Sequence, residues 1–97
     1  MTAYIYGNID IHDPVRYEQY RAQVPALVAA HGGRYLVRGG AVEVLEGEGE
    51  AARQVILEFP DMASLKAFYF SPEYTAVKAI RQQAATGTLV AIEGVLP

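Results

Sequence analysis

Apolar and polar residues alternate along four segments of the chain, in the two-residue rhythm of a half-buried β-strand. The first segment is AYIYGNIDI, residues 3–11, where Ile5 and Ile9 fall on one face and Tyr4 and Tyr6 on the other. The same rhythm predicts strands in residues 34–47, 53–59 and 88–95.

Between the first and second strands, apolar residues recur at helical spacing. Asp13 has the position of an N-cap and Pro14 that of the first helical residue, and the helix is expected to continue to His31. Pro25 lies inside it and removes one backbone hydrogen bond, so a kink or break is expected near Val24.

A second helical stretch, between the third and fourth strands, is expected to be broken in two. Asp61 can cap a short helix that continues through Phe68. Ser71 and Pro72 then have the positions of a new N-cap and first helical residue, opening a helix through Ala84.

Four glycines stand in HGGRYLVRGG, residues 31–40, and raise the question of a phosphate-binding loop. A P-loop requires Gly-Lys-Ser/Thr after its glycines, whereas GGA follows here. A dinucleotide fingerprint requires glycines between a strand and a helix, whereas Gly39 and Gly40 interrupt a predicted strand. The glycines are therefore interpreted as a helix end and a bulge.

The order strand, helix, strand, strand, helix, strand predicts an α+β fold of the ferredoxin-like βαββαβ type, formed by residues 1–97 as one domain. Its four antiparallel strands would carry both helices on one face. The second face mixes apolar and charged residues, which favours a homodimer formed through that face. It is expected to carry Tyr4, Tyr6, Leu36, Ile56 and Ala91 beside Asp10, Arg34, Arg38, Glu58 and Glu93.

Composition removes several classes of function. Eight Lys and Arg against eleven Asp and Glu give a net charge of -3, which argues against nucleic-acid binding. There is no cysteine, and His12 and His31 belong to no metal-binding motif, so no metal and no cofactor are expected. No signal or membrane-spanning segment is evident, which makes the cytoplasm the default location.

The stretches HGGRYLVRGG, LEG at 45–47, LEFPD at 57–61, FYFSPEY at 68–74 and IEG at 92–94 resemble, in order and spacing, the domain-of-unknown-function 1330 family. That family looks like a branch of the dimeric α/β-barrel superfamily, so the resemblance implies ferredoxin-like subunits that pair sheet to sheet. Phe68 stands where the family usually has Trp. The resemblance carries no catalytic residue onto this chain.

Candidate ligand-binding residues come from polar and aromatic positions near helix ends and the glycine stretch. Each has a structural alternative: helix capping for the histidine and the serine, and salt bridges to Glu58 or a partner for the arginines. Arg38 in particular is predicted near a pocket by its place beside the glycines, but on the dimer face by strand alternation. The candidates are His31, Arg34, Arg38, Tyr69, Ser71 and Tyr74.

Two classes of function stay open. The favoured one is a protein that binds a small anionic or aromatic organic ligand between helices and sheet, with cofactor-free oxygenase or isomerase chemistry as in some proteins of this fold, an analogy of fold alone. The alternative is a noncatalytic homodimeric binding or assembly protein. Whether the protein is an enzyme is not decided by the sequence.

Overall fold

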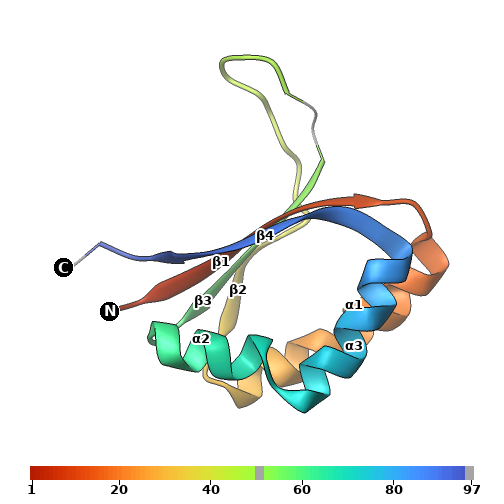
Figure 1. Ribbon diagram of the computed structural model, residues 1–97. Coiled ribbons are helices and arrows are strands. Elements are labelled where there is room, and N and C mark those ends of the chain that lie inside the picture. The colour runs from red at the N-terminus through yellow and green to blue at the C-terminus, as the bar shows by residue number, and fades with distance from the viewer. Residues whose placement is uncertain (50–51, 96–97) are drawn as a thin grey trace.

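The computed structural model describes residues 1–49 and 52–95 and has the predicted α+β, ferredoxin-like architecture. Three helices lie on one side of an antiparallel sheet with strand order β2-β3-β1-β4 (Figure 1). The elements in chain order are β1 (Ala3–Ile11), α1 (Pro14–Ala30), β2 (Arg34–Arg38), β3 (Arg53–Phe59), α2 (Met62–Tyr69), α3 (Pro72–Ala84) and β4 (Ala85–Glu93).

All three helices begin at the predicted N-caps. The Asp13 and Asp61 carboxylates accept hydrogen bonds from the first turns of α1 and α2, and the Ser71 hydroxyl accepts one from the backbone N–H of Tyr74 at 3.2 Å. The break expected near Val24 is absent, because α1 continues past Pro25 to Ala30.

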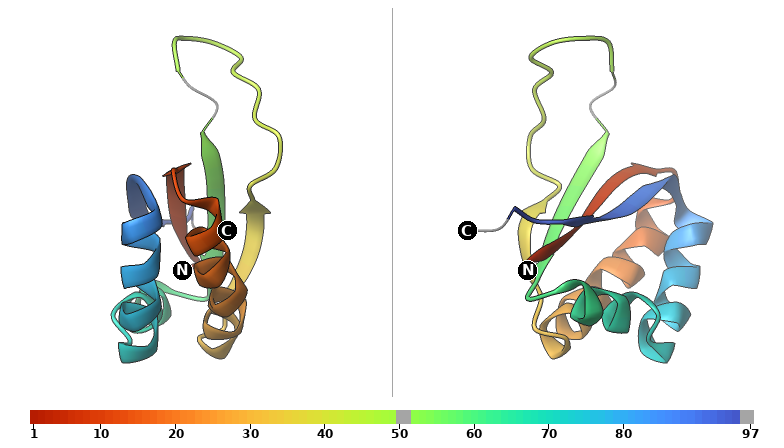
Figure 2. Two further views of the ribbon diagram at one scale, coloured as in Figure 1. Left: turned by 90° about the vertical axis from the view of Figure 1, so that its right-hand side faces the viewer. Right: turned by 60° about the vertical axis from the view of Figure 1, so that its left-hand side comes forward.

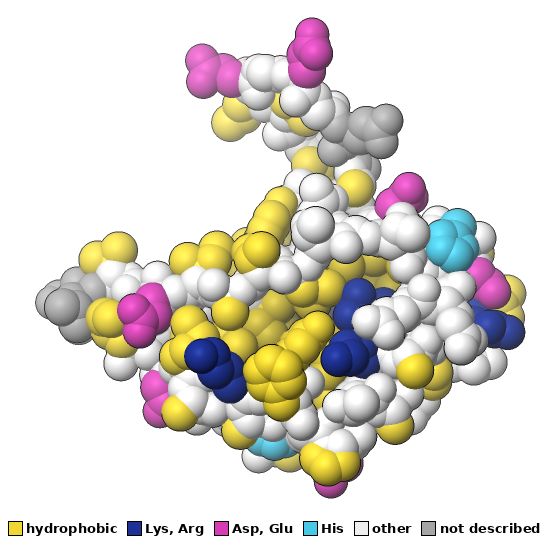
Figure 3. Space-filling view, viewed as in Figure 1, with side chains coloured by type: hydrophobic (Ala, Val, Ile, Leu, Met, Phe, Trp, Pro, Cys, Tyr) yellow, Lys and Arg dark blue, Asp and Glu magenta, His cyan; other side chains and the backbone are white. Residues whose placement is uncertain are grey.

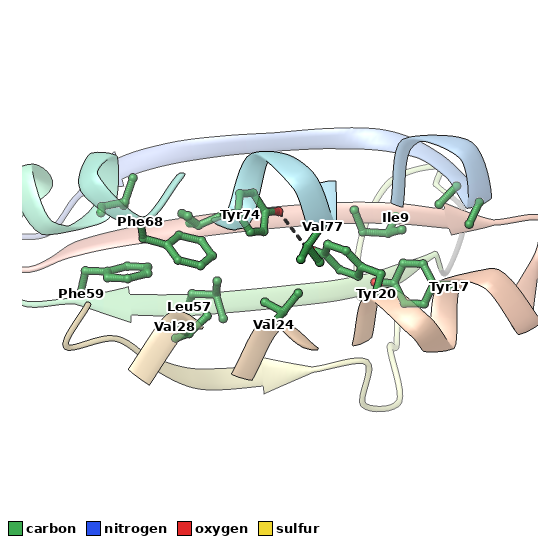
Figure 4. Close-up of a cluster of buried hydrophobic side chains, with 14 of the residues drawn as sticks. Ile9, Tyr17, Tyr20, Val24, Val28, Leu57, Phe59, Phe68, Tyr74 and Val77 are labelled. Carbon is green, nitrogen blue, oxygen red and sulfur yellow. Dashed lines mark hydrogen bonds between the residues drawn. The ribbon is translucent and has the colours of Figure 1, made fainter. Parts of the chain in front are cut away.

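The core fills the space between the helices and the inner face of the sheet, the face that the helices cover (Figure 4). Aromatic rings make up much of it: the Phe68 ring lies 5.3 Å from Phe59 and 4.5 Å from Tyr74 between centroids. Such offset contacts stabilise a core beyond the area that they bury.

β2 contains a bulge, but not at the position predicted from the sequence. Tyr35 pairs with Leu57 and Val37 with Ile56, so Leu36 is an extra residue in the ladder. The expected irregularity lay further on, at the glycines. An extra residue reverses the alternation of every side chain after it.

The bulge separates the two arginines of β2. Arg34 pairs with Glu58 on the outer face, the face of the sheet away from the helices, as expected. Arg38 pairs with Val55 and lies on the inner face, so the prediction that both arginines share the outer face is wrong.

Residues 41–49, between β2 and β3, extend away from the sheet (Figure 2). Residues 41–46, predicted as a continuation of the strand, are not in a strand, because β3 begins only at Arg53 and offers them no partner. The turn predicted at 47–50 lies partly outside the described residues, since Glu50 is not among them.

The outer face is mixed, as predicted, and it carries further exposed apolar residues. Val90 pairs with Tyr6 and Ile92 with Tyr4, and nearly half of each aliphatic side chain is exposed. Ala91 pairs with Ile5 and therefore lies on the helix side of the sheet. Glu93, two residues further along β4, lies on the same side. The prediction that these two residues lie on the outer face is wrong.

β4 begins at Ala85, directly after α3, three residues earlier than expected, and so includes Gly87. Gly87 has φ +150°, and a Cβ there would overlap the carbonyl oxygen of Asn8 on β1. This glycine lets β4 approach β1 closely where the chain leaves the helix.

We predict that Gly87→Ala lowers the free energy of unfolding by about 2 kcal/mol or more, because both the backbone conformation and the close approach are lost. Gly40→Ala is the control, since a Cβ there meets no atom within 4 Å. Urea denaturation of both variants measures the difference, and equal stabilities would contradict the assignment.

Candidate functional site

A pocket lies between the helices and the inner face of the sheet, with a free volume of about 30 Å³. We call it the inner pocket. Residues from all seven elements line it, including Ile5 of β1, Phe68 of α2 and Leu89 of β4. The fold as a whole therefore positions this site.

Positive charge converges on the inner pocket. Four of the chain's eight Lys and Arg line it, although the protein carries a net charge of -3. No Asp or Glu of the described residues lines it. The four are Arg21, Arg38, Arg53 and Arg81.

Two of these guanidinium groups have buried atoms without a partner. The Nε atoms of Arg53 and Arg81 are buried and make no hydrogen bond within the described protein. Arg81 is only 7% exposed, and its Cζ lies 5.8 Å from the Tyr20 ring centroid, while the Cζ of Arg53 lies 5.6 Å from that of Tyr17. A buried charged donor without an acceptor is costly, so these two groups favour an anion in the pocket.

Phenol groups form a second part of the inner pocket. The Tyr20 and Tyr74 hydroxyls are buried and hydrogen-bonded to each other at 2.8 Å, as the dashed line in Figure 4 shows. Burial raises the pKa of both phenols above the ordinary value for tyrosine. Both are therefore neutral near pH 7, and one O–H of the pair remains free to donate.

Three glycines have separate structural roles at or near the inner pocket. Gly39 has φ +71°, and a Cβ there would overlap the guanidinium of Arg53. Gly7, on the inner face of β1, leaves space beside Leu89. Gly32, with φ +76°, ends α1 as predicted.

Arg38 lies at the rim of the inner pocket. Its Nη2 donates to the Arg21 carbonyl oxygen at 2.9 Å, and its Cζ lies 4.7 Å from the centroid of the half-buried Tyr35 ring. Arg38 is exposed, so it adds positive charge at the mouth rather than in the interior.

Two wider hollows adjoin the inner pocket along β4, and Figure 3 shows a hollow lined by hydrophobic side chains with basic side chains beside it. The one between β4 and α2 measures about 240 Å³, and we call it the outer groove. The other, about 350 Å³ and more polar, lies at the start of β4 and includes Arg81 and Thr86. The outer groove is lined by Ile5, Leu65, Lys66, Tyr69, Phe70, Leu89, Val90 and Ala91.

Three of the residues predicted from the sequence lie at these cavities. Arg38 and Tyr74 line the inner pocket, and Tyr69 lines the two adjoining hollows, with its ring 5.5 Å from that of Tyr74.

The other three have the structural contacts considered as alternatives. His31 caps α1, with its Nδ1 2.9 Å from the Leu27 carbonyl oxygen. Arg34 donates through Nε to Glu58 at 3.1 Å on the outer face. Ser71 caps α3 and donates to the Phe68 carbonyl oxygen at 2.8 Å.

Sequence reasoning missed Arg53, Arg81 and Tyr20, although signals for them exist. Arg53 shares the alternation of Val55 and the other inward residues of its strand. Arg81 stands four residues after the buried Val77, so it falls on the buried face of α3. A charged residue in phase with a buried face is such a signal.

The chain belongs to the family of the domain of unknown function DUF1330, whose family model matches residues 2–95. No protein with a curated description matches it. In the described part of the chain, no helix is long and apolar enough to span a membrane, and no group of three or more His, Asp or Glu side chains is placed to hold a metal ion.

Solved structures share the fold at low sequence identity. The RPA0582 protein of unknown function from Rhodopseudomonas palustris is 17% identical, with a TM-score of 0.75 over 99% of this chain and 84% of that one. A dimeric ferredoxin-like protein of unknown function from Jannaschia sp. CCS1 is 17% identical, with a TM-score of 0.73 over 97% and 100%. SnoaB, a cofactor-independent oxygenase from Streptomyces nogalater, is 13% identical, with a TM-score of 0.63 over 99% and 95%.

The raised pKa values of the two buried phenols predict how the stability of the protein changes in alkaline solution. Folding raises the pKa of Tyr20 and Tyr74. Their contribution to the free energy of unfolding is therefore complete below about pH 10 and is lost as the pH rises further. Each phenol then lowers the free energy of unfolding by up to about 1.4 kcal/mol per pH unit.

Urea denaturation between pH 9 and about pH 11 should therefore show a shallower decline for Tyr20→Phe than for the wild type. At pH 7 the free energy of unfolding of the same variant should be about 1 kcal/mol lower than that of the wild type, because the hydrogen bond to Tyr74 is missing. A decline of equal slope in both proteins would contradict the role given to burial.

Proposed function

We propose that this protein binds a small organic anion with an apolar or aromatic body in the inner pocket. The observation that carries the proposal is the pair of buried Nε atoms of Arg53 and Arg81, which have no partner and no lining acid beside them among the described residues. An anion supplies the acceptors that these donors lack, and guanidinium groups bind carboxylates through charge-assisted hydrogen bonds. Neutral phenols beside them add further donors.

Catalysis is a second candidate. The phenol pair of Tyr20 and Tyr74 lies beside the guanidinium groups, and together they offer donors to negative charge that develops on a bound substrate. The similar fold of SnoaB, a cofactor-independent oxygenase, agrees with this chemistry by analogy of fold. Ligand-dependent oxygen consumption by the purified protein would favour it over binding alone.

The protein is proposed to act as a homodimer joined through the outer face. A solved structure of similar fold is a dimeric ferredoxin-like protein. The exposed Val90 and Ile92 beside Tyr4 and Tyr6 are apolar surface that a second copy would cover. The alternative to ligand binding, a noncatalytic assembly role, would depend on this face alone. A cytoplasmic location stays a prediction.

A panel of small carboxylic acids and phenols is predicted to contain a thermal stabiliser. A ligand at a hundred times its Kd adds about 2.7 kcal/mol, which corresponds to a rise in Tm of about 10 °C or more for a protein of this size. Arg81→Met should abolish the rise, because the anion loses its buried donor.

The same variant separates a binding role from a structural one. Without ligand, Arg81→Met should keep its stability or gain about 1–3 kcal/mol, because an unpaired buried charge is removed. Arg16→Met, an exposed arginine on α1, is the matched control and should retain the ligand response. A marked loss of stability in unliganded Arg81→Met would show that the arginine is structural and would oppose the proposal.

Gly7→Ala tests the space in the inner pocket. Its new methyl group would lie 3.5 Å from the Leu89 Cγ, an ordinary contact, so the fold should tolerate it. We predict weaker ligand binding at unchanged stability, with Gly40→Ala as the control. Undiminished binding would place the ligand elsewhere.

For the dimer, Tyr6→Glu is predicted to shift the protein toward the monomer, because it places an unpaired charge in the contact. Light scattering measures the mass against the 10.6 kDa of one chain. Gln19→Glu on the exposed side of α1 adds the same charge and should leave the mass unchanged. A wild type that is monomeric at micromolar concentration would refute this interface.

A further inference from the structure

We infer that the ligand is a monocarboxylic acid with an apolar body, whose carboxylate occupies the inner pocket and whose body lies in the outer groove. This inference rests on the proposed function and assigns the substrate class of the same site. It follows from how the two cavities join, from the different chemistry of their walls and from their sizes.

The two cavities share a wall. Ile5 of β1 and Leu89 of β4 line both the inner pocket and the outer groove. Tyr69 lines the outer groove, and its ring contacts that of Tyr74, which lines the inner pocket. The two cavities are therefore neighbours on either side of shared side chains, and the inferred ligand lies along Leu89 in both.

The walls of the outer groove are suited to an apolar occupant. Apart from Lys66, its lining consists of aliphatic and aromatic side chains, with no acid among the described residues. Phe70 is 69% exposed at its edge, next to the Tyr69 ring. Covering these side chains removes apolar surface from water, which favours an apolar body.

The inner pocket is suited to a carboxylate in size and in donors. Its free volume of about 30 Å³ holds about two water-sized atoms, which matches the two oxygens of a carboxylate and is small for the four oxygens of a phosphate. Two unpartnered Nε–H donors match two carboxylate oxygens. The charge of the ligand is therefore expected at one end only.

The size of the outer groove limits the body of the ligand. Its volume of about 240 Å³ is just below the roughly 300–1,000 Å³ of pockets that enclose drug-sized molecules. A chain of several methylenes or one aromatic ring fits this space, whereas a nucleotide or a polycyclic ring system exceeds it.

The test compares the affinities of acetate, butanoate, hexanoate and octanoate, measured by titration calorimetry on the 97-residue chain. Octanol and octyl phosphate are the matched compounds with another head group. Affinity should rise roughly two- to fourfold for each methylene added. Octanol should bind at least tenfold more weakly than octanoate. A flat series would overturn the inference, and so would tighter binding of octyl phosphate.

Variants in the outer groove separate the two cavities. Phe70→Ala removes an exposed wall and Ala91→Leu fills the groove, and neither residue lines the inner pocket. Both should weaken octanoate binding about tenfold and leave acetate binding unchanged. Val15→Ala, an exposed apolar residue on α1, is the control and should change neither.

The outcomes distinguish this inference from the proposed function. If acetate binds through Arg81 but octanoate gains nothing, the inference is wrong and the proposed function stands. If neither the carboxylates nor octyl phosphate bind, both are wrong. If Phe70→Ala lowers the mass of the dimer and leaves octanoate binding unchanged, the groove is covered by a second copy of the chain and the inference is overturned.

Discussion

Two guanidinium groups, those of Arg53 and Arg81, have buried Nε atoms and pair with no acid among the residues that the structure describes, and the proposed chemistry of the helix side of the sheet depends on this constraint. Burying a charge without a partner costs free energy. Acids of the described residues pair elsewhere: Glu58 lies on the outer face with Arg34, and Glu18 pairs with Arg21 on the surface of α1. Under the proposed function, this arrangement preorganises the site for an anion from solution.

Backbone details at three points maintain this arrangement. The bulge at Leu36 turns Arg38 toward the helices. Gly39 has no side chain where the guanidinium of Arg53 lies, and Gly7 leaves free volume in the floor of the pocket. The bulge at Leu36 and the positive φ of Gly39 are local departures from regular strand geometry, and both bear on arginines that line the pocket. Such departures from local rules are expected at functional sites rather than in structural positions.

The sequence predicts the fold well and the site in part, for a physical reason. Alternation and N-caps are local properties, so the order of elements and the starts at Asp13, Asp61 and Ser71 are confirmed. The sequence predicts Tyr74 and Arg38 as candidates, but the convergence of Arg53 and Arg81 depends on the fold bringing β3 and α3 to the same pocket, which no local pattern contains. The bulge was misplaced because glycines were the only visible interruption, whereas the extra residue is Leu36.

The most direct test of the account observes the arginine side chains themselves. In protein labelled with nitrogen-15 in arginine, the Nε–H resonances of Arg53 and Arg81, assigned by replacing each arginine with lysine, are followed during titration with octanoate. The account predicts saturable shifts of these two resonances with a common Kd, while those of Arg16 and Arg34 stay in place. Shifts confined to the surface arginines, or none at saturating octanoate, would contradict an anion site between the helices and the sheet.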